Sequence, residues 1–480
     1  MTVERTLKKE MQAERIKVSK SEGDYQIALY TKKGYKTYNL YSKEFQLALK
    51  LFFLDNHGER LQIKEVLEAI NYLELECFKC ENVDTLYHRV YLENKSTYLY
   101  DLGNNQCVWI QDGECSIEQC PDFLFKHSNN FEPQVTPDFN VDPLDLFYYV
   151  EKHFNVMDED SLILLTLNIV ASMCSLEFNH ALVMFQGEKG SGKSQALRKF
   201  GMIIDPQKSG ICSFPSKKDG LVLRLRNSYL VTWDNASFIS QQNSDLLCMA
   251  ITGASDTDRQ LYSSTEERIV NLHSIIAMSC INMVARSSDL IDRICLIKLE
   301  RLQSEDLKTE DELMESFIED LPKILGAIFL IINEVLSDTS KVKIKKKIRL
   351  ADFHEWCVRI GKVLDIEESE ITRILFQNRM EMSVDVLEAN TASICLIELM
   401  KDIDEYVDTP TACLNDLKGV ANKLGIDITT LPRDASRLTR ILIPIISELK
   451  TVHEIEFSIE RGKTRRYHII NRKLFKDEED

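Results

Sequence analysis

The sequence predicts an α/β core with an α+β domain before it and helical and winged-helix domains after it. Three observations lead to this prediction. Between residues 141 and 302, apolar strands alternate with loops and helices, which is typical of a mostly parallel sheet. Residues 305–400 are charged, amphipathic and helical in their periodicity. Residues 401–480 indicate helices followed by a basic hairpin.

Composition limits the class of protein. The 480 residues suggest about three domains at roughly 150 residues each. A hydrophobic fraction of 44% and a charged fraction of 28% exclude a fibrous or wholly disordered chain. The net charge of −17 does not indicate nucleic-acid binding, although a local basic surface would suffice for it. We place the domain boundaries at 1–140, 141–302, 303–400 and 401–480, the first within a proline-containing segment.

The sequence also bears on location. The most apolar stretch, Leu162–Leu176, is shorter than the about 20 residues of a membrane span and contains polar side chains. The N-terminus lacks the apolar segment of a signal peptide. The lack of a span predicts no membrane partner. The 13 cysteines are an odd number scattered through apolar runs, which favours reduced, buried thiols in a cytoplasmic protein.

Individual elements follow from periodicity and turn residues. A hairpin is predicted around Gly103, Asn104 and Asn105. The predicted helices are Phe45–Phe53, Leu61–Leu75, Pro143–Phe154, Asp158–Leu176, Thr411–Leu424 and Arg433–Leu449. The predicted core strands are Ala181–Phe185, Tyr229–Asp234, Ile275–Ile281 and Ile294–Leu299.

The strongest motif is GEKGSGKS, which matches G-x-x-x-x-G-K-S between a strand and a helix. Glycines allow backbone N–H groups to converge on phosphates, and the helix N-terminus adds positive charge. The lysine reaches the phosphates, and the serine hydroxyl ligates Mg²⁺. The motif therefore predicts a P-loop core that binds ATP and Mg²⁺ through Gly187, Glu188, Lys189, Gly190, Ser191, Gly192, Lys193, Ser194 and Gln195.

A second carboxylate must help to hold the metal ion, and Asp234 ends a predicted strand. Ser194 and Asp234 are thus the predicted Mg²⁺ ligands. Asn235 follows, where many such ATPases carry an acid; an amide can orient water but cannot accept its proton. Glu188 is a possible substitute, and the sequence leaves the base unassigned.

Further polar residues follow the next strands. Asn282 is placed to contact the γ-phosphate or the attacking water. Arg286 and Arg293 are two candidates for an arginine that reaches a neighbouring subunit, and each has local pairing with Asp289 or Asp292 as its alternative. Residues 258–270 predict a hairpin with Arg259 and Arg268, which could track single-stranded DNA, although acidic residues accompany them.

Basic residues gather near the C-terminus. Two helices and a basic hairpin are the order of a winged helix, for which the alternative is a small packing domain. The expected DNA contacts are Arg437 and Arg440, with Arg433 on the same face, and Arg461, Lys463, Arg465 and Arg466. Residues 340–349 form a second basic segment, either a phosphate contact or a solvated linker. Cys77, Cys80, Cys115 and Cys120 allow a four-cysteine zinc site, which competes with an apolar role for hairpin cysteines.

The ordered segments GEKGSGKS, YLVTWDN, ITGASDTDRQLY, IIAMSCIN and DLIDR resemble the AAA+-like ATPase core of superfamily III helicases. The resemblance is to the primase–helicase type of phages, plasmids and mobile genetic islands, over about residues 40–400. It implies catalytic roles for Lys193, Asp234, Asn235, Asn282, Arg286 and Arg293, a hexameric ring and DNA as partner. The N-terminal segment shows no closely spaced carboxylates of a primase site.

The sequence therefore predicts an ATP hydrolase that acts as a ring-forming DNA helicase in replication initiation of a mobile element in a bacterial host. The resemblance implies 3′→5′ movement. Two alternatives remain: an ATP-switched helicase loader, and an origin-binding initiator without unwinding activity.

Overall fold

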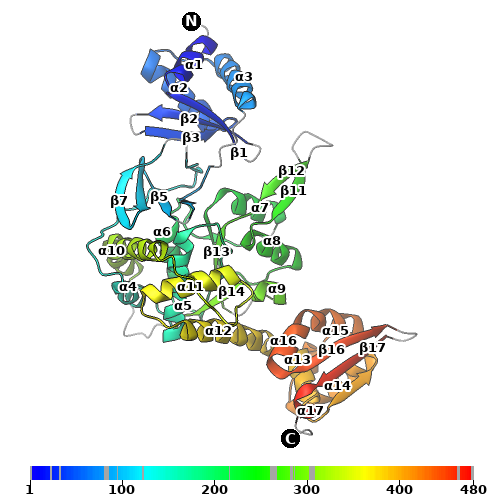
Figure 1. The fold of residues 1–480 in the computed structure, drawn as a ribbon. Helices are drawn as coiled ribbons and strands as arrows, with labels where there is room; N and C mark the ends of the chain where they lie inside the picture. The colour runs from blue at the N-terminus through cyan, green and yellow to red at the C-terminus, as the bar shows by residue number, and fades with distance from the viewer. Residues whose placement is uncertain are drawn as a thin grey trace.

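The computed structural model describes residues 3–21, 24–31, 34–80, 86–94, 96–121, 124–215, 217–259, 267–281, 285, 287–301, 309–461 and 465–476. The N-terminal region, the central sheet and the C-terminal region follow one another along its long axis (Figure 1). Three predicted site residues, Asn282, Arg286 and Lys463, lie outside the described residues. None of the described helices is long and apolar enough to cross a membrane.

The first unit is a three-stranded antiparallel sheet with three helices, built on its own hydrophobic core. Both predicted helices are confirmed, and Ser42 caps α2 by accepting a hydrogen bond from Phe45 N. Buried Leu7, Phe45, Phe53 and Leu73 hold helices and sheet together. The elements are α1 (Val3–Gln12), β1 (Ile16–Ser21), β2 (Asp24–Thr31), β3 (Gly34–Asn39), α2 (Lys43–His57) and α3 (Ile63–Lys79).

A four-stranded antiparallel sheet follows, with β4 (Val90–Glu93), β5 (Thr97–Gly103), β6 (Gln106–Gln111) and β7 (Glu114–Gln119). The predicted hairpin is confirmed between β5 and β6. Its turn is left-handed at all three turn residues, which suits Gly and Asn. Although these strands fall within the predicted 1–140 domain, most of their buried hydrophobic residues join the central core, while Leu99 and Cys107 belong to a small separate cluster.

The central sheet has the order β14-β8-β13-β10-β9, and every neighbouring pair is parallel. The α/β core is thus present. Its strands are apolar because helices cover both faces: α5 packs on β14, and α6 packs on β10 and β13. The strands are β8 (Leu182–Gln186), β9 (Cys212–Ser213), β10 (Leu230–Asp234), β13 (Ile275–Cys280) and β14 (Ile294–Lys298).

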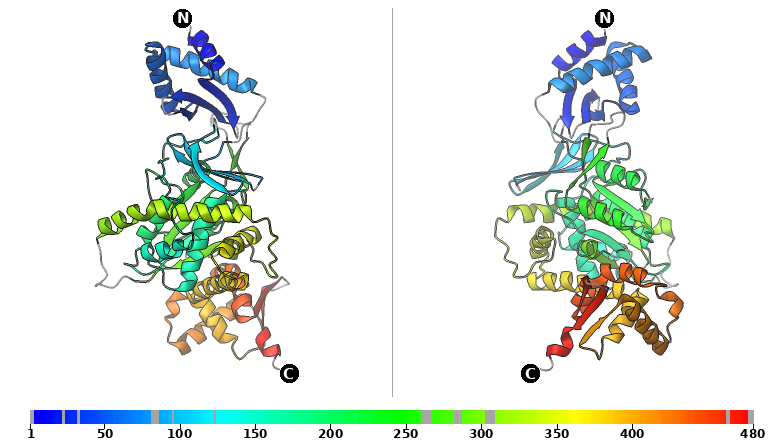
Figure 2. Two further views of the ribbon diagram at one scale, coloured as in Figure 1. Left: turned by 60° about the vertical axis from the view of Figure 1, so that its left-hand side comes forward. Right: turned by 90° about the vertical axis from the view of Figure 1, so that its right-hand side faces the viewer.

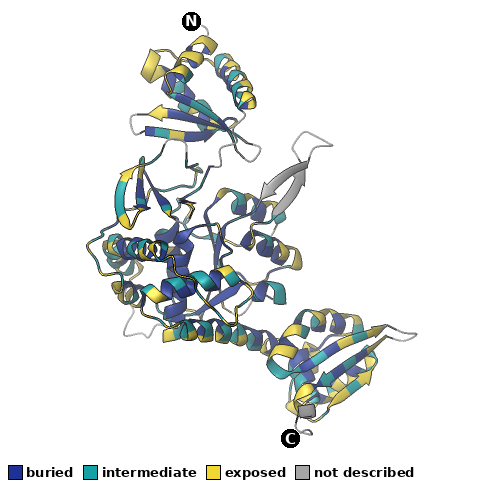
Figure 3. Ribbon diagram, in the orientation of Figure 1, coloured by how far each residue is buried: buried dark blue, intermediate teal, exposed yellow. Residues whose placement is uncertain are grey.

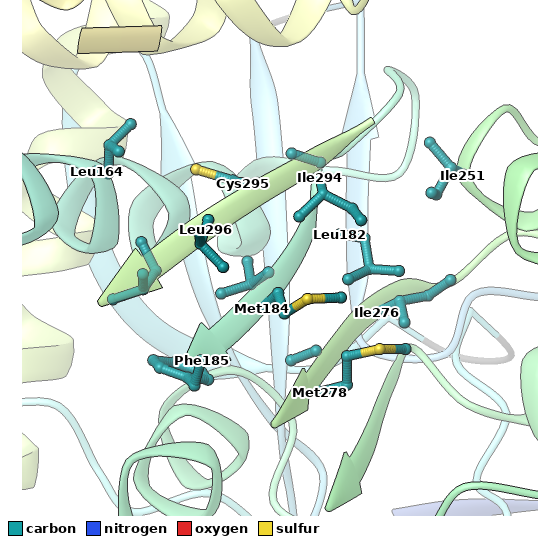
Figure 4. Packing of buried hydrophobic residues seen from close by; sticks show 14 of the residues in the cluster. Leu164, Leu182, Met184, Phe185, Ile251, Ile276, Met278, Ile294, Cys295 and Leu296 are labelled. Carbon is teal, nitrogen blue, oxygen red and sulfur yellow. The ribbon is translucent and has the colours of Figure 1, made fainter. Parts of the chain in front are cut away.

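Helices surround the central sheet, and the views from other sides show α10 lying across the core (Figure 2). Leu164 of α5 and Ile251 of α8 pack toward Met184, Met278 and Leu296 on the strands (Figure 4). The helices are α4 (Asp145–His153), α5 (Glu159–Cys174), α6 (Lys193–Ile204), α7 (Lys218–Asn227), α8 (Gln241–Ile251), α9 (Ser288–Ile291), α10 (Glu310–Ser337), α11 (Ala351–Val363), α12 (Glu368–Glu388) and α13 (Thr391–Leu399).

The predicted hairpin at 258–270 exists as the antiparallel pair β11 (Ser255–Arg259) and β12 (Glu267–Asn271). It extends from the side of the core (Figure 1). Residues 260–266, the predicted tip, lie outside the described residues.

The basic segment 340–349 links α10 to α11 without helix or strand. Its cations engage neighbours: Lys346 Nζ lies 4.6 Å from the Phe376 ring centroid, and Lys347 Nζ lies 3.5 Å from Glu355 Oε2. This arrangement favours the linker interpretation.

The C-terminal unit contains α14 (Pro410–Leu424) and the sheet β15-β17-β16, formed by Glu405–Asp408, Arg465–Asn471 and Ile455–Arg461. The hairpin prediction is confirmed, but the single helix predicted over Arg433–Leu449 is wrong. Instead α15 (Ala435–Leu442) and α16 (Ile446–His453) flank a 3₁₀ turn at Ile443–Ile445. Pro444 lies in this turn, where its ring and missing N–H interrupt the helix.

Candidate functional site

The loop 187–192 joins β8 to α6 at the carboxyl edge of the central sheet. Gly190 and Gly192 have φ of 90° and 79°, a left-handed backbone that favours glycine. A Cβ on Gly187 would lie 2.4 Å from Ser191 Oγ and 2.9 Å from Leu299 O. The motif glycines are therefore required by the fold of the loop itself.

Lys193 opens α6, and its side chain turns back beneath the loop. Its Nζ donates to Gly187 O at 2.8 Å and to Glu188 O at 2.7 Å. The side chain is buried, and burial lowers its pKa against the opposing effects of Cys280 and Asp234. A buried ammonium is thus held by carbonyl groups at the mouth of the loop.

Ser194 lies in α6, which follows β8, and Asp234 ends β10. The two side chains come together although β13 separates β8 from β10 in the sheet. Ser194 Oγ donates to Asp234 Oδ2 at 2.8 Å. The sequence prediction that these two side chains share a site agrees with this contact. It also follows that the strand preceding Asn282 lies between the two elements, as expected.

Sequence reasoning missed Ser279, the penultimate residue of β13. Its hydroxyl donates to Asp234 Oδ1, and Asn235 N donates to both Asp234 Oδ1 (3.0 Å) and Ser279 Oγ (2.9 Å). Ser279 is fully buried in a run of apolar residues, and that polar interruption was the available signal. Together these bonds fix the orientation of the Asp234 carboxylate.

Asn235 itself has a left-handed backbone, with φ of 53°. Its Nδ2 lies 3.4 Å from Asp234 Oδ2, so the amide contacts the carboxylate.

Glu188, the possible substitute for the missing acid, is exposed and forms an ion pair with Arg301 at 3.7 Å. A cleft of about 500 Å³ opens beside Asp234 and Asn235, lined also by Cys212, Phe214, Phe238 and neighbouring residues.

Asp385 on α12 is a second residue that sequence reasoning missed. It accepts a hydrogen bond from Gln186 Nε2 at 3.5 Å, next to the start of the loop. Burial raises its pKa, and Glu381 and Glu388 add to this effect while Gln186 and Lys298 oppose it. No local signal marked it, because only packing of α12 along β14 brings it to the sheet edge.

Arg293 is buried and paired within its own chain. Its guanidinium lies 2.7 Å from Asp289 Oδ1, the local pairing left open as the alternative to a role in trans. Burial of Asp289 opposes ionisation, but hydrogen bonds from Arg293 and Cys248 lower its pKa. Arg349 also contacts Asp289, at 2.5 Å, so the carboxylate joins two cations.

The predicted DNA contacts lie on two separate elements. Arg437 and Arg440 are exposed on α15, and Arg465 and Arg466 are exposed on β17. The burial colouring shows buried and exposed residues alternating over this C-terminal unit (Figure 3). Arg433 precedes Asp434, the N-cap of α15, and so is not part of the helix. In backbone register, Arg259 faces Glu267, Arg268 faces Asp258, and Arg461 faces Arg465.

The four-cysteine zinc alternative is wrong. Cys120 forms a disulfide with Cys107. Cys77, Cys115 and Cys120 belong to three different hydrophobic clusters. The expectation of an apolar role for the hairpin cysteines therefore holds for Cys115, which is free and packs against the central core.

The family model of the actinomycete integrative conjugative element replication protein matches residues 158–377. No curated protein matches the chain. Among solved structures, the A-form apo structure of the NrS-1 C-terminal region is 13% identical, with 96% of this chain and 98% of that chain covered and a TM-score of 0.41. A second apo structure of that region is 13% identical, with 98% of this chain and 99% of that chain covered and a TM-score of 0.38. The segment containing the loop, Asp234 and Arg293 is thus similar to a replication protein of a mobile element.

Proposed function

We propose that the chain is an ATP-dependent DNA helicase or translocase that acts in replication of a mobile genetic element. The observation that carries this proposal is the meeting of Lys193, Ser194 and Asp234 at one sheet edge, with Ser194 Oγ 2.8 Å from Asp234 Oδ2. Ligands of open α/β sheets bind at the carboxyl ends of the strands. The similarity to a mobile-element replication protein over residues 158–377 supports the biological setting.

The residues fit an ATP–Mg²⁺ complex. Ser191 Oγ and Gln195 Oε1 are buried without a hydrogen-bond partner among the described residues, at the loop and the first turn of α6. Buried polar atoms in this position suit a polar ligand. Ser194 and Asp234 would hold Mg²⁺, and Lys193 would exchange its carbonyl contacts for phosphate oxygens. When bound, the ion neutralises charge on the phosphates.

Asp385 is our candidate for the water-activating base, since Asn235 cannot take a proton. Its carboxylate lies at the loop, and its raised pKa brings it nearer to neutrality, where a base works best. Asn282 remains the proposed sensor, and Arg286 or Arg293 the proposed finger in a hexameric ring. Arg293 would need to release Asp289 to act across an interface.

The proposed DNA contacts are the β11–β12 hairpin and the winged-helix-like C-terminal unit. In that unit α15 presents Arg437 and Arg440, and the β16–β17 hairpin presents Arg465 and Arg466. A helix that reads a groove and a wing that holds the backbone is a known docking arrangement. Movement from 3′ to 5′ is part of the same proposal.

The second candidate function is an ATP-switched helicase loader or origin-binding initiator without unwinding activity. Asn235 favours it, because the position after Asp234 carries no acid and Glu188 is exposed beside Arg301.

Strand displacement on a forked duplex, measured with ATP turnover on the full chain, separates these functions. The Lys193→Ala variant is the test, and Lys323→Ala, an exposed lysine on α10, is the matched control. Unwinding by the wild type and the control alone supports the helicase. ATP turnover and DNA binding without unwinding support the loader. No ATP turnover in the wild type overturns the helicase and the ATP-switched loader, and DNA binding without turnover supports the origin-binding initiator.

A further inference from the structure

Three side chains with metal-ligating atoms meet beside the β5–β7 sheet, away from the phosphate-type loop, and a fourth, His127, contacts one of them. Asp101 lies in β5, Cys107 in β6, and Cys120 directly after β7. The ligand atoms of these three lie within 4.8 Å of one another; Asp101 and Cys107 are buried, and Cys120 is partly buried. His127 Nε2 lies 2.5 Å from Asp101 Oδ2, and Cys120 Sγ lies 3.9 Å from Asp101 Oδ1.

The carboxylate of Asp101 is unusual because it is only 1% exposed. Its oxygens accept from Gly103 N at 2.8 Å and contact His127. The nearest arginine, Arg89, directs its guanidinium to the Asp101 backbone carbonyl and to the carboxylate of Asp205. A buried carboxylate without a paired fixed cation is costly, and a bound cation removes that cost.

We propose that Asp101, Cys107, Cys120 and His127 bind one zinc ion when the two cysteines are reduced. Two thiolates, an imidazole and a carboxylate make a four-donor set of the kind that zinc takes in tetrahedral sites. In the structure the two sulfur atoms form a disulfide, with the Cα atoms 5.1 Å apart. Zinc-bound thiolates lie about 3.8 Å apart for Zn–S bonds of about 2.3 Å. Side-chain rotation provides that separation without moving the strands.

The remaining cysteines favour the reduced form. The other eleven cysteines form no disulfide among the described residues, and most are buried. A disulfide is uncommon in proteins that keep their other thiols reduced, whereas paired cysteines with a histidine nearby commonly bind metal there. Zinc deprotonates its thiol ligands, and its positive charge stabilises the buried thiolates that result.

The surroundings assign the ion a structural role. The His127 ring stacks on Phe131 with centroids 4.0 Å apart, which fixes the imidazole. Asn130 lies between these two residues, and its Nδ2 donates hydrogen bonds to Gln207 Oε1 and Ser209 Oγ, which follow α6 in the chain. Zinc would therefore fasten the β5–β7 sheet to the segment that anchors it on the central core.

Metal content of the full chain tests the proposal. Protein is prepared with zinc and reductant, desalted, and analysed by mass spectrometry of the metal and by thiol titration. We expect about one zinc per chain in the wild type. Cys107→Ser and Cys120→Ser should each lose most of it, and Cys115→Ser, the free cysteine of β7, should keep it.

Cobalt provides a readout that does not depend on the folding of variants. Reduced wild-type protein loaded with Co²⁺ should show thiolate charge-transfer and tetrahedral d–d bands, which zinc displaces. His127→Ala should weaken cobalt binding by about 10–100-fold. Absence of zinc and of these bands in the fully reduced wild type overturns the proposal. Zinc retained by both Cys107→Ser and Cys120→Ser overturns it as well, and neither result bears on ATP turnover.

Discussion

The loop edge of the central sheet and the junction between α9, α12 and α16 differ in the partners of their buried polar side chains. At the loop, Ser191 and Gln195 keep buried oxygens without partners among the described residues. At the junction, Arg379 joins Asp292 of the core to Glu448 of the C-terminal unit. Glu448 is fully buried; its Oε1 lies 2.9 Å from Arg379, and its Oε2 has no hydrogen-bond partner among the described residues. The oxygens at the loop belong to neutral side chains that can accept hydrogen bonds from a ligand, whereas the charges paired through Arg379 join two parts of the chain.

The sharpest test of this contrast is Asp234→Asn. Loss of the carboxylate that faces Ser194 should lower ATP turnover by about 10³-fold, because the fixed charge for the metal ion is gone. Thermal stability should change little. Steady-state turnover and a melting curve measure the two effects, and an active variant would remove Asp234 from the proposed site.

Arg379→Ala should show the reverse pattern. It leaves Glu448 and Asp292 without their shared partner, and removing one member of a buried pair costs about 3–5 kcal/mol. Burial already raises the pKa of Glu448, and Arg379 opposes that rise. Denaturant unfolding of the full chain measures the loss. Arg379→Met with Glu448→Leu should recover most of it, and equal instability of the double variant would contradict the pairing argument.

Asp385→Asn should reduce turnover by about 10²-fold if this carboxylate activates water. Because its pKa is raised, the group becomes ionised, and so active, at a higher pH than an ordinary aspartate. The acid limb of the wild-type pH profile should therefore be shifted upward and should vanish in the variant. The contribution of Asp385 to stability changes with pH in the opposite direction to activity: it is full at low pH and declines as pH rises through the folded-state pKa. Glu315→Gln, exposed on α10 and absent from the groups that shift the pKa of Asp385, is the control.

The smallest effect is expected for Arg440→Ala on α15. An exposed arginine that contacts a phosphate should weaken DNA binding uniformly across sequences and reduce the salt slope by about 1. Fluorescence anisotropy at several salt concentrations measures this. Unchanged affinity and slope would favour a packing role for the C-terminal unit.

Patterns of neighbouring residues in the sequence were enough to predict many of the strands, turns and helices of this molecule. The strand, glycine-rich loop and helix around Lys193, the strand that ends in Asp234, and the three antiparallel hairpins were predictable from residues close together in the chain. Each depends on short-range physics: apolar periodicity, left-handed glycines and turn residues. The error at Arg433–Leu449 was also local, because Pro444 was visible and its effect on the helix was not applied.

Only the tertiary structure decided which distant side chains meet. Ser279 reaches Asp234 because β13 lies beside β10, and Asp385 reaches Gln186 because α12 runs along β14. The partners of Cys107 and Arg379 were equally unavailable from spacing, whereas Asp289, the partner of Arg293, was one of the two local alternatives that the sequence offered. Periodicity specifies which face of an element is buried, but contacts between elements depend on packing and sheet order, and a single sequence does not encode these at any fixed separation.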